Sequence, residues 1–508
     1  MNVEASLTEE LPSNIESGET SICSNETTPL VNALPSEASL EIAKRDTIDP
    51  YPTAARKEVQ WMLTSSSLTI LTLMLEMSFF FVNILAVSHL GAKELAAMSL
   101  AVTCTGIIAL APTFGLMSAM ETFCSTAYTA SRDKTLVGFH FQRGLIAAFT
   151  HFIIVIPILW YAESILLIMK QDPAIAHLSG IYLRIQILGI LPWSIFESCK
   201  RYLQAQEIMR AGTIVMMIVA PLHWINNYVF VRSETYGLGF IGAPIITMAS
   251  NWMLVICIVI YTCNSRAKET WGGWDKRAFH NMQEFYRLAI PSVITVCAEW
   301  LCFELLTIGT SYFGANQLAG QAIVFNSVLL IFQLSNGLGF GTSPRIGNLI
   351  GAGKPRQAHI AADMAVAAST VIGIAGTLFL SLCGGWWISV YTDDPAVAYE
   401  AVKLMPIACL FLISVGLNAV LGAILRGLGR QQISAGVYMI GFYNCAIPVS
   451  IYLGYVKHME AYGLWVGLCF GVLVSSALHL LYIYKWIDWR DEVRLCLLRL
   501  QKTQESND

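Results

Sequence analysis

Four glutamates stand inside long apolar runs of the sequence, where an ionisable side chain has to serve a purpose. They are Glu76, Glu121, Glu299 and Glu304. A charged group in hydrocarbon costs about 3 kcal/mol or more, so such a group is a functional candidate by default. Burial favours the protonated form of a carboxyl, whereas a nearby cation favours the ionised form. A carboxyl in such a run can therefore exchange a proton for a positively charged ligand.

Glu299 and Glu304 share one apolar run. Glu299 follows Arg287 by twelve residues, which places it about 18 Å along a helix. Glu304 comes five residues later, so the two side chains project about 140° apart. They could line one cavity without forming a close dyad; the alternative is that helix–helix hydrogen bonds satisfy both. Glu76 and Asn83, seven residues apart, share one helix face.

Three other charged residues have simpler expectations. Glu163 and Glu197 stand near the ends of their apolar runs, where snorkelling or helix capping accounts for them. Arg184 lies within a run and has no partner nearby in the sequence. We expect it to pair with an interior acid, since a buried base needs a counter-charge.

The composition is that of a polytopic membrane protein. Of 508 residues, 55% are hydrophobic and 13% are charged, against about 45–50% and about 25% in soluble domains. This excludes a soluble enzyme, a disordered protein and a nucleic-acid binder with a basic surface. Most of the 13 cysteines lie in apolar runs, with no CxxC pair or Cys/His cluster. The sequence therefore predicts no metal site, no redox motif and no cofactor.

Twelve windows are long enough to cross a bilayer as helices, which takes about 20 apolar residues each. They are residues 62–88, 97–128, 144–168, 176–198, 211–231, 238–263, 288–313, 317–341, 365–390, 404–425, 434–456 and 463–484. With the N-terminus in the cytoplasm, 25 of the 31 Lys and Arg residues fall in the cytoplasmic tails and links, and five fall on the opposite side. Only Arg184 lies within a window. The positive-inside rule thus predicts a multi-pass protein with both termini cytoplasmic.

The two halves of the sequence repeat each other. Gly91-Ala-Lys-Glu-Leu95-Ala96 recurs as Gly314-Ala-Asn-Gln-Leu318-Ala319, and Asp172-Pro173-Ala recurs as Asp394-Pro395-Ala. The offsets are 223 and 222 residues, and the matches fall in equivalent links. Each half holds six spans, and because six is an even number both halves enter the membrane from the same side. The two repeats are therefore parallel. Transporters that work by alternating access commonly have this plan, with the substrate site between the repeats.

The repeat also predicts the domain organisation. We expect six-helix bundles over residues 61–263 and 288–484, joined by a cytoplasmic linker over 264–287. Residues 1–60 are rich in Ser, Thr and Glu and lack the apolar core of a signal peptide, which predicts a disordered cytoplasmic tail. Residues 485–508 mix apolar and basic side chains, which predicts a cytoplasmic tail with an interfacial helix.

Several motifs together resemble eukaryotic multidrug and toxic compound extrusion (MATE) transporters. The seventh span carries Glu299-Trp300-Leu-Cys-Phe303-Glu304, similar to that family's E-W-x-x-[FY]-E signature. Further similar segments are residues 115–122, 202–206, 345–353 and 426–427. The resemblance covers about residues 55–486. It implies a V-shaped arrangement of two six-helix bundles and efflux of organic, usually cationic compounds in exchange for protons or Na⁺.

The resemblance also implies roles for individual residues. Glu299 and Glu304 match the signature glutamates that couple cations and balance substrate charge. Glu121 matches an acid that holds the cytoplasmic end of the second span, and Arg345 and Arg426 stand in matching motifs, so these three are expected to be structural. Candidates for the substrate pathway are Glu76, Asn83, Trp300, Gln321, Asn326 and Tyr443.

Three positions depart from the family's pattern. Many animal members have Glu where Asn326 stands, an acid is common at the position of Val415, and bacterial relatives have Asp where Asn83 stands. These departures make a Na⁺ site, or a proton site in the first half, less expected. They concentrate the coupling on the seventh span, unless Glu76, on the same helix face as Asn83, takes the place of the missing acid.

The resulting hypothesis is a proton-coupled antiporter for small organic compounds, acting as a monomer in the plasma or vacuolar membrane. One rival is a lipid or lipid-linked-sugar flippase of the same superfamily. It would need a basic cavity for phosphate, whereas only Arg184 is basic within the predicted spans. The other rival is a membrane-embedded enzyme, which would need a cluster of catalytic groups, whereas His151 and His223 stand isolated. No nucleic-acid partner is expected.

Overall fold

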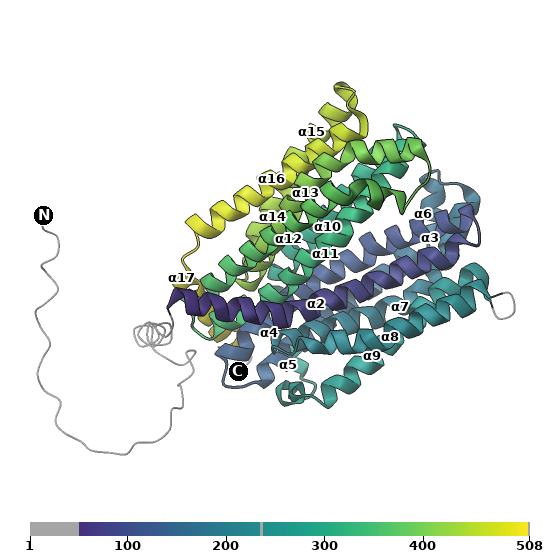
Figure 1. The fold of residues 1–508 in the computed structure, drawn as a ribbon. Coiled ribbons are helices and arrows are strands. Elements are labelled where there is room, and N and C mark those ends of the chain that lie inside the picture. The colour runs from purple at the N-terminus through teal and green to yellow at the C-terminus, as the bar shows by residue number, and fades with distance from the viewer. Residues whose placement is uncertain (1–49, 234–236, 506–508) are drawn as a thin grey trace, which may run out of the picture.

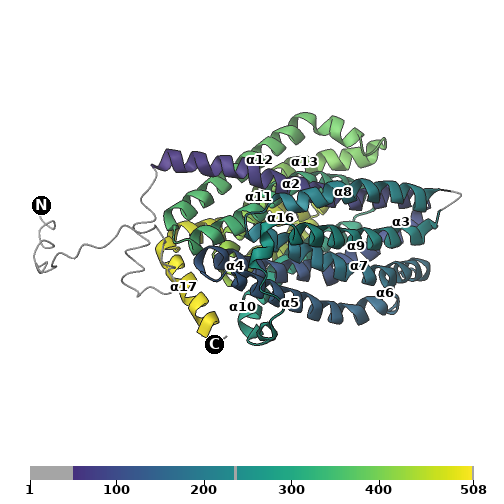
Figure 2. The ribbon, with the colours of Figure 1, turned by 90° about the horizontal axis from the view of Figure 1, so that it is seen from below.

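The computed structural model describes residues 50–233 and 237–505, and every regular element in these ranges is a helix. Twelve helical segments are long and apolar enough to cross a membrane. They form two bundles that meet at one end and diverge toward the other, as a V (Figure 1). Figure 2 shows the same helices from below. The predicted all-helical fold with twelve spans and a V shape is confirmed.

The first bundle, here the N bundle, contains the first six spans. They are α2 (Tyr51–Ser88), then α3 (Ala92–Thr105) continued by η2 (Gly106–Leu110) and α4 (Ala111–Ala130), then α5 (Thr135–Trp160), α7 (Pro173–Ala205), α8 (Arg210–Asn227) continued by η3 (Tyr228–Arg232), and α9 (Gly242–Cys263). Four short helices lie in the connections: α6 (Ala162–Ile168), η4 (Gly239–Ile241), η5 (Arg266–Thr270) and η6 (Lys276–Phe279).

The second bundle, the C bundle, contains the other six spans. They are α10 (Met282–Ser311), α11 (Ala315–Gly351), α12 (Pro355–Ser389), α13 (Pro395–Gly427), the composite of α14 (Gln431–Tyr438), η7 (Met439–Ala446), α15 (Ile447–Ile451) and η8 (Tyr452–Val456), and α16 (Glu460–Lys485). A final helix, α17 (Trp489–Glu505), follows the last span.

The repeated sequence motifs are helix starts. Asp172 caps α7 by accepting hydrogen bonds from the backbone N–H groups of Ala174 and Ile175, at 2.9 and 3.2 Å. Asp394 caps α13 in the same way, through the N–H of Ala396 at 2.9 Å. In both helices a proline occupies the first turn, where its missing N–H is not needed. The repeat therefore encodes equivalent helix beginnings in the two bundles.

Two spans contain π-helical turns next to a proline. η2 precedes Pro112, and η7 precedes Pro448. A proline frees the carbonyl four residues earlier, and here that carbonyl lies inside the π turn. Such turns reorient the side chains that follow and are frequent at functional sites.

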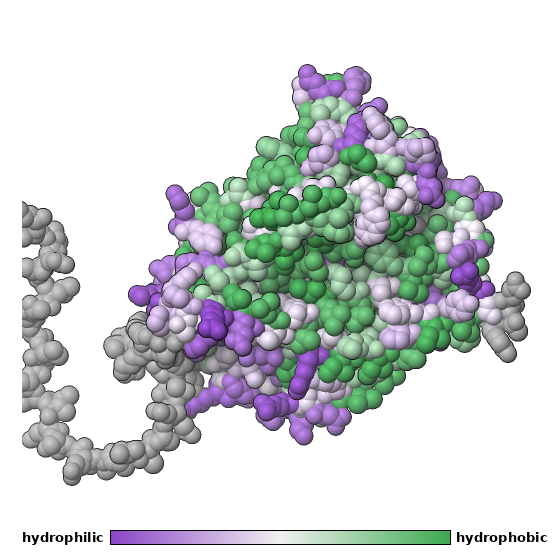
Figure 3. Space-filling view, viewed as in Figure 1, coloured by the Kyte–Doolittle hydropathy of each residue, from purple (hydrophilic) through white to green (hydrophobic). Residues whose placement is uncertain are grey.

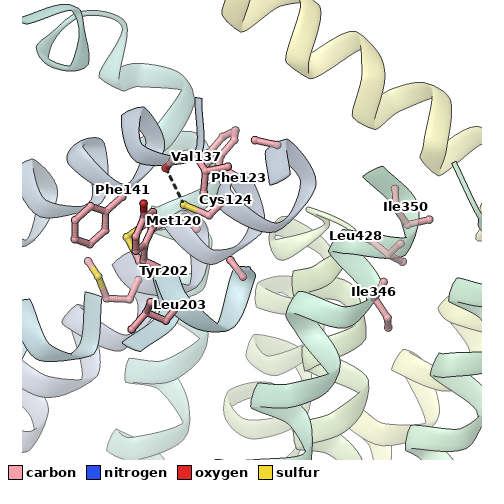
Figure 4. Packing of buried hydrophobic residues seen from close by; sticks show 14 of the residues in the cluster. Met120, Phe123, Cys124, Val137, Phe141, Tyr202, Leu203, Ile346, Ile350 and Leu428 are labelled. Atoms are coloured by element: carbon pink, nitrogen blue, oxygen red, sulfur yellow. Dashed lines mark hydrogen bonds between the residues drawn. The ribbon is translucent and has the colours of Figure 1, made fainter. Parts of the chain in front are cut away.

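The buried hydrophobic residues explain the V. One cluster joins both bundles at the end where α2 begins and α16 ends, here the termini end. Figure 4 shows part of it: Phe123 on α4 and Ile346 on α11 belong to this one core. Two further clusters lie wholly within one bundle each, toward the opposite end, here the far end. The bundles are thus packed together at the termini end and separate at the far end.

The outer surface matches the apolar interior of a bilayer. Hydrophobic residues dominate the middle of the face in Figure 3, and hydrophilic residues gather toward its two ends. Large hydrophobic side chains on the spans are exposed, among them Leu63, Leu85, Ile158 and Leu382. The chain is therefore a multi-pass membrane protein.

Three helices differ from the expectations. α2 begins at Tyr51, so the predicted tail over residues 1–60 is wrong for its last ten residues; residues 1–49 lie outside the described part. Pro52 stabilises this early start, because proline suits the first helical turn. α7 extends to Ala205, beyond the predicted end at residue 198. α17 forms as predicted, but it packs against α4, α11 and α12 and buries Val493 completely.

Candidate functional site

α10 carries both signature glutamates and lies between the two bundles. It packs against α4 of the N bundle and α14 of the C bundle. Ser118 of α4 donates a hydrogen bond to Ser292 of α10 at 3.1 Å. A Cβ atom on Gly115 would stand 2.5 Å from the backbone of Val293, so only glycine allows this close crossing. The crossing fixes α10 at the junction of the V.

Glu299 is half-buried on α10 and makes no hydrogen bond or ion pair with any described residue. Arg426 of α13 and Tyr438 of α14 lie within electrostatic range of it. Tyr443 of η7 donates a hydrogen bond to the carbonyl of Ala298 at 3.3 Å, which holds the backbone beside Glu299. The carboxyl is thus placed by its neighbours but left without a fixed partner.

Arg426 is also without a fixed partner. Within the described ranges its guanidinium makes no hydrogen bond or ion pair, although Glu121 and Glu299 both lie within electrostatic range. Its backbone carbonyl accepts a hydrogen bond from Thr122 of α4 at 2.8 Å. An unpaired cation beside an unpaired carboxyl leaves both groups available to a third charge, such as a proton or a cationic ligand.

Glu304 lies further toward the far end of the molecule. It is half-buried, and its carboxyl faces Thr103 of α3, so it too stands between the bundles. The two glutamates lie on different sides of α10, as the predicted 140° separation requires, and they do not contact each other.

A second polar feature is a buried charge cluster made of Glu76, Glu121, Glu197, Lys200 and Arg201. Lys200 contacts Glu76 and Glu197, each at 2.6 Å. Arg201 contacts Glu121 at 2.5 Å and Glu197 at 3.0 Å. All but Glu76 have side chains that are at most 5% exposed. The cluster joins α2, α4 and α7 at the termini end of the N bundle.

The charge cluster borders a cavity in the N bundle of about 180 Å³. Glu76 and Asn83 both line it, as the shared helix face predicts. Asn83 donates a hydrogen bond to Thr247 at 3.1 Å, while its side-chain oxygen and that of Gln186 are buried with no partner among the described residues. Two unpartnered acceptors and one carboxyl give this cavity the chemistry to hold a hydrogen-bond donor.

The remaining candidates for the substrate pathway lie in the C bundle or at the junction. The ring of Trp300 lies tilted beside that of Phe114 of α4, with ring centroids 6.3 Å apart. Gln321 donates a hydrogen bond to Thr307 at 3.3 Å. Asn326 is half-buried and makes no hydrogen bond within the described residues. The structure does not bring these three together into one pocket with Glu76 and Asn83.

Arg345 connects the two bundles at the termini end. Its guanidinium, on α11, contacts Glu58 of α2 at 2.7 Å and Glu207, after α7, at 3.0 Å. It also lies over the ring of Trp61, 5.0 Å from the centroid. Arg345 thus makes ion pairs from the C bundle to the N bundle at this end, and its structural role stays a prediction.

Three expectations about charged residues need correction. Arg184 does pair with an acid, Glu163, at 2.8 Å, so Glu163 is an ion-pair partner and not a snorkelling side chain. Glu197 is 1% exposed and bridges Lys200 and Arg201. The statement that Arg184 is the only base within a span is wrong, because Lys200 and Arg201 lie in α7 and Arg426 lies in α13.

Sequence reasoning missed Lys200 and Arg201 because it ended the fourth span too early. A signal was present: Glu197, Lys200 and Arg201 have the i, i+3 and i+4 spacing of ion pairs on one helix face.

His223 hydrogen-bonds Ser250 at 2.9 Å and Asn227 at 3.0 Å. The described residues hold no group of three His, Cys, Asp or Glu side chains that could bind a metal ion.

Comparison with known proteins supports one assignment. The profile of the family described as MatE matches residues 69–229 and 291–452. A Schizosaccharomyces pombe protein, uncharacterized transporter C4B3.13, is 32% identical over 83% of this chain and 78% of its own length. Multidrug and toxin extrusion protein 1 of Xenopus tropicalis is 27% identical over 86% of this chain and 76% of its own. The crystal structure of the eukaryotic MATE transporter AtDTX14 superposes with a TM-score of 0.83 at 25% identity, over 88% of this chain and all of that one.

Proposed function

The chain belongs to the MatE family of multidrug and toxin extrusion transporters, and we propose that it is a proton-coupled antiporter for small organic cations. The observation that carries the proposal is Glu299, a half-buried carboxyl at the junction of the bundles with no partner among the described residues. A secondary transporter needs such a group, because the coupling site must change its charge during the cycle.

We place the termini end in the cytoplasm. The bases that set topology lie mostly in the tails and links of that end. The V then opens toward the exterior or an organelle lumen, so the structure represents the outward-open state. In that state the ion pairs of Arg345 hold the cytoplasmic end closed.

In the proposed cycle, Glu299 takes up a proton in the outward-open state and loses its attraction for the bound cation. The substrate leaves, and the bundles then close outside and open to the cytoplasm. Glu299 releases its proton there and attracts the next cation. Arg426 assists this exchange, because its positive charge repels a cation bound beside Glu299. The ionised carboxylate of Glu299 offsets that repulsion, and the protonated carboxyl does not.

Other polar residues have supporting roles in this proposal. Glu304 balances substrate charge nearer the exterior, and Trp300, Gln321, Asn326 and Tyr443 flank the pathway. Glu76 and Asn83 offer a second polar position in the N bundle. Asn83, Asn326 and Val415 stand where acids of a Na⁺ site, or of a proton site in the first half, are expected. Their absence favours protons over Na⁺ and concentrates the coupling on Glu299 and Glu304. The protein acts as a monomer in the plasma or vacuolar membrane.

The charge pattern favours cations over the phosphate groups that a lipid flippase would carry. Lys200 and Arg201 of the charge cluster are both paired with carboxylates. Arg143, which is also buried in the N bundle, donates a hydrogen bond to the carbonyl of His280 at 3.0 Å. Arg426 lies within electrostatic range of Glu299. An anionic substrate would meet more acid than base at this junction.

The test is transport of a fluorescent organic cation by proteoliposomes under an imposed pH gradient. Glu299→Gln should abolish pH-driven transport, and Glu400→Gln, at a loosely paired acid near the far end, should not. A Na⁺ gradient without a pH gradient should drive nothing. Normal pH-driven transport by the folded Glu299→Gln variant would overturn the proposed coupling site.

The membrane is tested separately by localising the tagged, full-length protein. Plasma-membrane staining would mean export from the cell, and staining of a vacuolar membrane would mean sequestration. Co-purification of two differently tagged copies in detergent would contradict the proposed monomer.

A further inference from the structure

A large hollow lies at the termini end of the N bundle, away from the junction of the V. Its volume is about 1080 Å³. Arg210 at the start of α8, Ser65 of α2 and Asn264, directly after α9, lie on its sides. The turn from Gln206 to Met209 and the loop after α9 close the other sides.

The polar side of the hollow has an excess of positive charge. Lys134, Arg210 and Arg266 line it, together with two acids, Glu207 and Glu269. Glu207 is already paired with Arg345 at 3.0 Å. Arg210 and Arg266 make no hydrogen bond or ion pair within the described residues. Lys134 donates hydrogen bonds to the backbone carbonyls of Tyr128 and Ser131, so its positive charge meets no carboxylate.

The walls of the hollow are apolar and continue along the outer surface. Leu68 of α2 and Ile260 of α9 line it. One helical turn further from the termini end, Leu71 is 42% exposed, Ile214 of α8 is 40% exposed and Ile256 of α9 is 56% exposed. Residues one turn apart lie on the same helix face. A basic recess is thus continuous with an exposed apolar track over three adjacent spans.

We propose that this hollow binds an anionic phospholipid of the adjoining leaflet, with the phosphate of its headgroup between Arg210 and Arg266 and its acyl chains along the apolar track. Arginine suits phosphate because its guanidinium donates two parallel hydrogen bonds. A soluble phosphate compound would meet the same bases but would leave the apolar track uncovered. A bilayer lipid satisfies both parts, and anionic lipids attract basic groups close to the membrane surface.

The test uses the full-length protein in detergent and native mass spectrometry with phosphatidylglycerol and phosphatidylcholine. We expect phosphatidylglycerol to bind more tightly than phosphatidylcholine by about tenfold. The double variant Arg210→Gln/Arg266→Gln should lose that preference. The matched control Arg132→Gln/Lys268→Gln removes two nearby exposed bases that do not line the hollow and should keep it.

A third variant tests the sign of the effect. Glu269→Gln removes an acid from the hollow, so it should strengthen phosphatidylglycerol binding, whereas a merely unspecific surface change would not. Competition by soluble glycerol phosphate at equal concentration would indicate a phosphate site without lipid. Equal binding of both lipids, or an unchanged preference in the folded Arg210→Gln/Arg266→Gln variant, would overturn the proposal.

Discussion

Three acids and two bases make up the buried charge cluster, so it carries one excess negative charge when all five groups are ionised. Glu76 is the member with a single basic contact and the most exposed side chain, at 20%. A proton shared within the cluster would therefore reside most easily on Glu76, which faces the cavity of the N bundle. Glu197, by contrast, touches both bases.

This asymmetry predicts different costs for two substitutions in the cluster. Lys200→Met leaves two buried carboxylates without their shared base and should lower the free energy of unfolding by about 3–5 kcal/mol. Glu76→Gln keeps a hydrogen-bonding side chain beside Lys200 and should cost less than about 1 kcal/mol. Thermal unfolding of the purified variants in detergent measures both.

Lys93→Met serves as the control for the loss of a lysine, since Lys93 is exposed. Equal destabilisation by Lys200→Met and Glu76→Gln would show that the cluster does not share its charge in this way.

At the scale of elements, α17 closes the termini end from outside the bundles. Glu492, at 4% side-chain exposure, pairs with Arg430 at 2.7 Å, and Trp489 stacks on His359 of α12 with ring centroids 5.1 Å apart. Because α17 contacts α4 of the N bundle as well as α11 and α12 of the C bundle, the bundles cannot separate at this end while α17 keeps all its contacts.

Cys496 reports on that contact. It is 5% exposed on α17, and burial raises the pKa of its thiol to about 11. At pH 8 the thiol is both covered and protonated, so a water-soluble maleimide should label it at least about tenfold more slowly than the exposed Cys263. Mass spectrometry after timed labelling measures the two rates.

The contact itself can be weakened for comparison. Glu492→Gln removes the ion pair with Arg430 and should speed labelling of Cys496 while leaving Cys263 unchanged. Rapid labelling of Cys496 in the unsubstituted protein would mean that α17 does not stay packed.

How far the sequence predicts the molecule can be judged from individual helices. The apolar windows predicted the spans, and the repeat at Asp172 and Asp394 predicted two parallel halves, because span length and repetition are local or periodic signals. The V shape came only from the resemblance to MATE transporters. The end of α7 was missed although Glu197 stands one turn before Lys200 and Arg201, because the other two partners of these bases are distant in the sequence. Those partners, Glu76 and Glu121, lie 124 and 80 residues away. No local pattern announces such a contact.

At the scale of the whole molecule, the two bundles are joined mainly at the termini end. The shared hydrophobic core and the ion pairs of Arg345 both act there. The proposed alternating access requires these contacts to break and the far end to close, which would make the structure one of two states whose balance depends on them. Ion pairs suit this role, because their loss in one state can be offset by water.

Arg345→Gln should therefore shift the balance toward the state that is open at the termini end. Losing the ion pairs with Glu58 and Glu207 should cost the present state about 2 kcal/mol, which changes the population ratio about thirtyfold. Distances between spin labels on α2 and α11 at the termini end should lengthen. Glu207→Gln should shift them less, since Glu207 is 44% exposed and Glu58 is 6% exposed. If both variants kept the distances of the unsubstituted protein, the hydrophobic core alone would hold the bundles together and Arg345 would not act as their clamp.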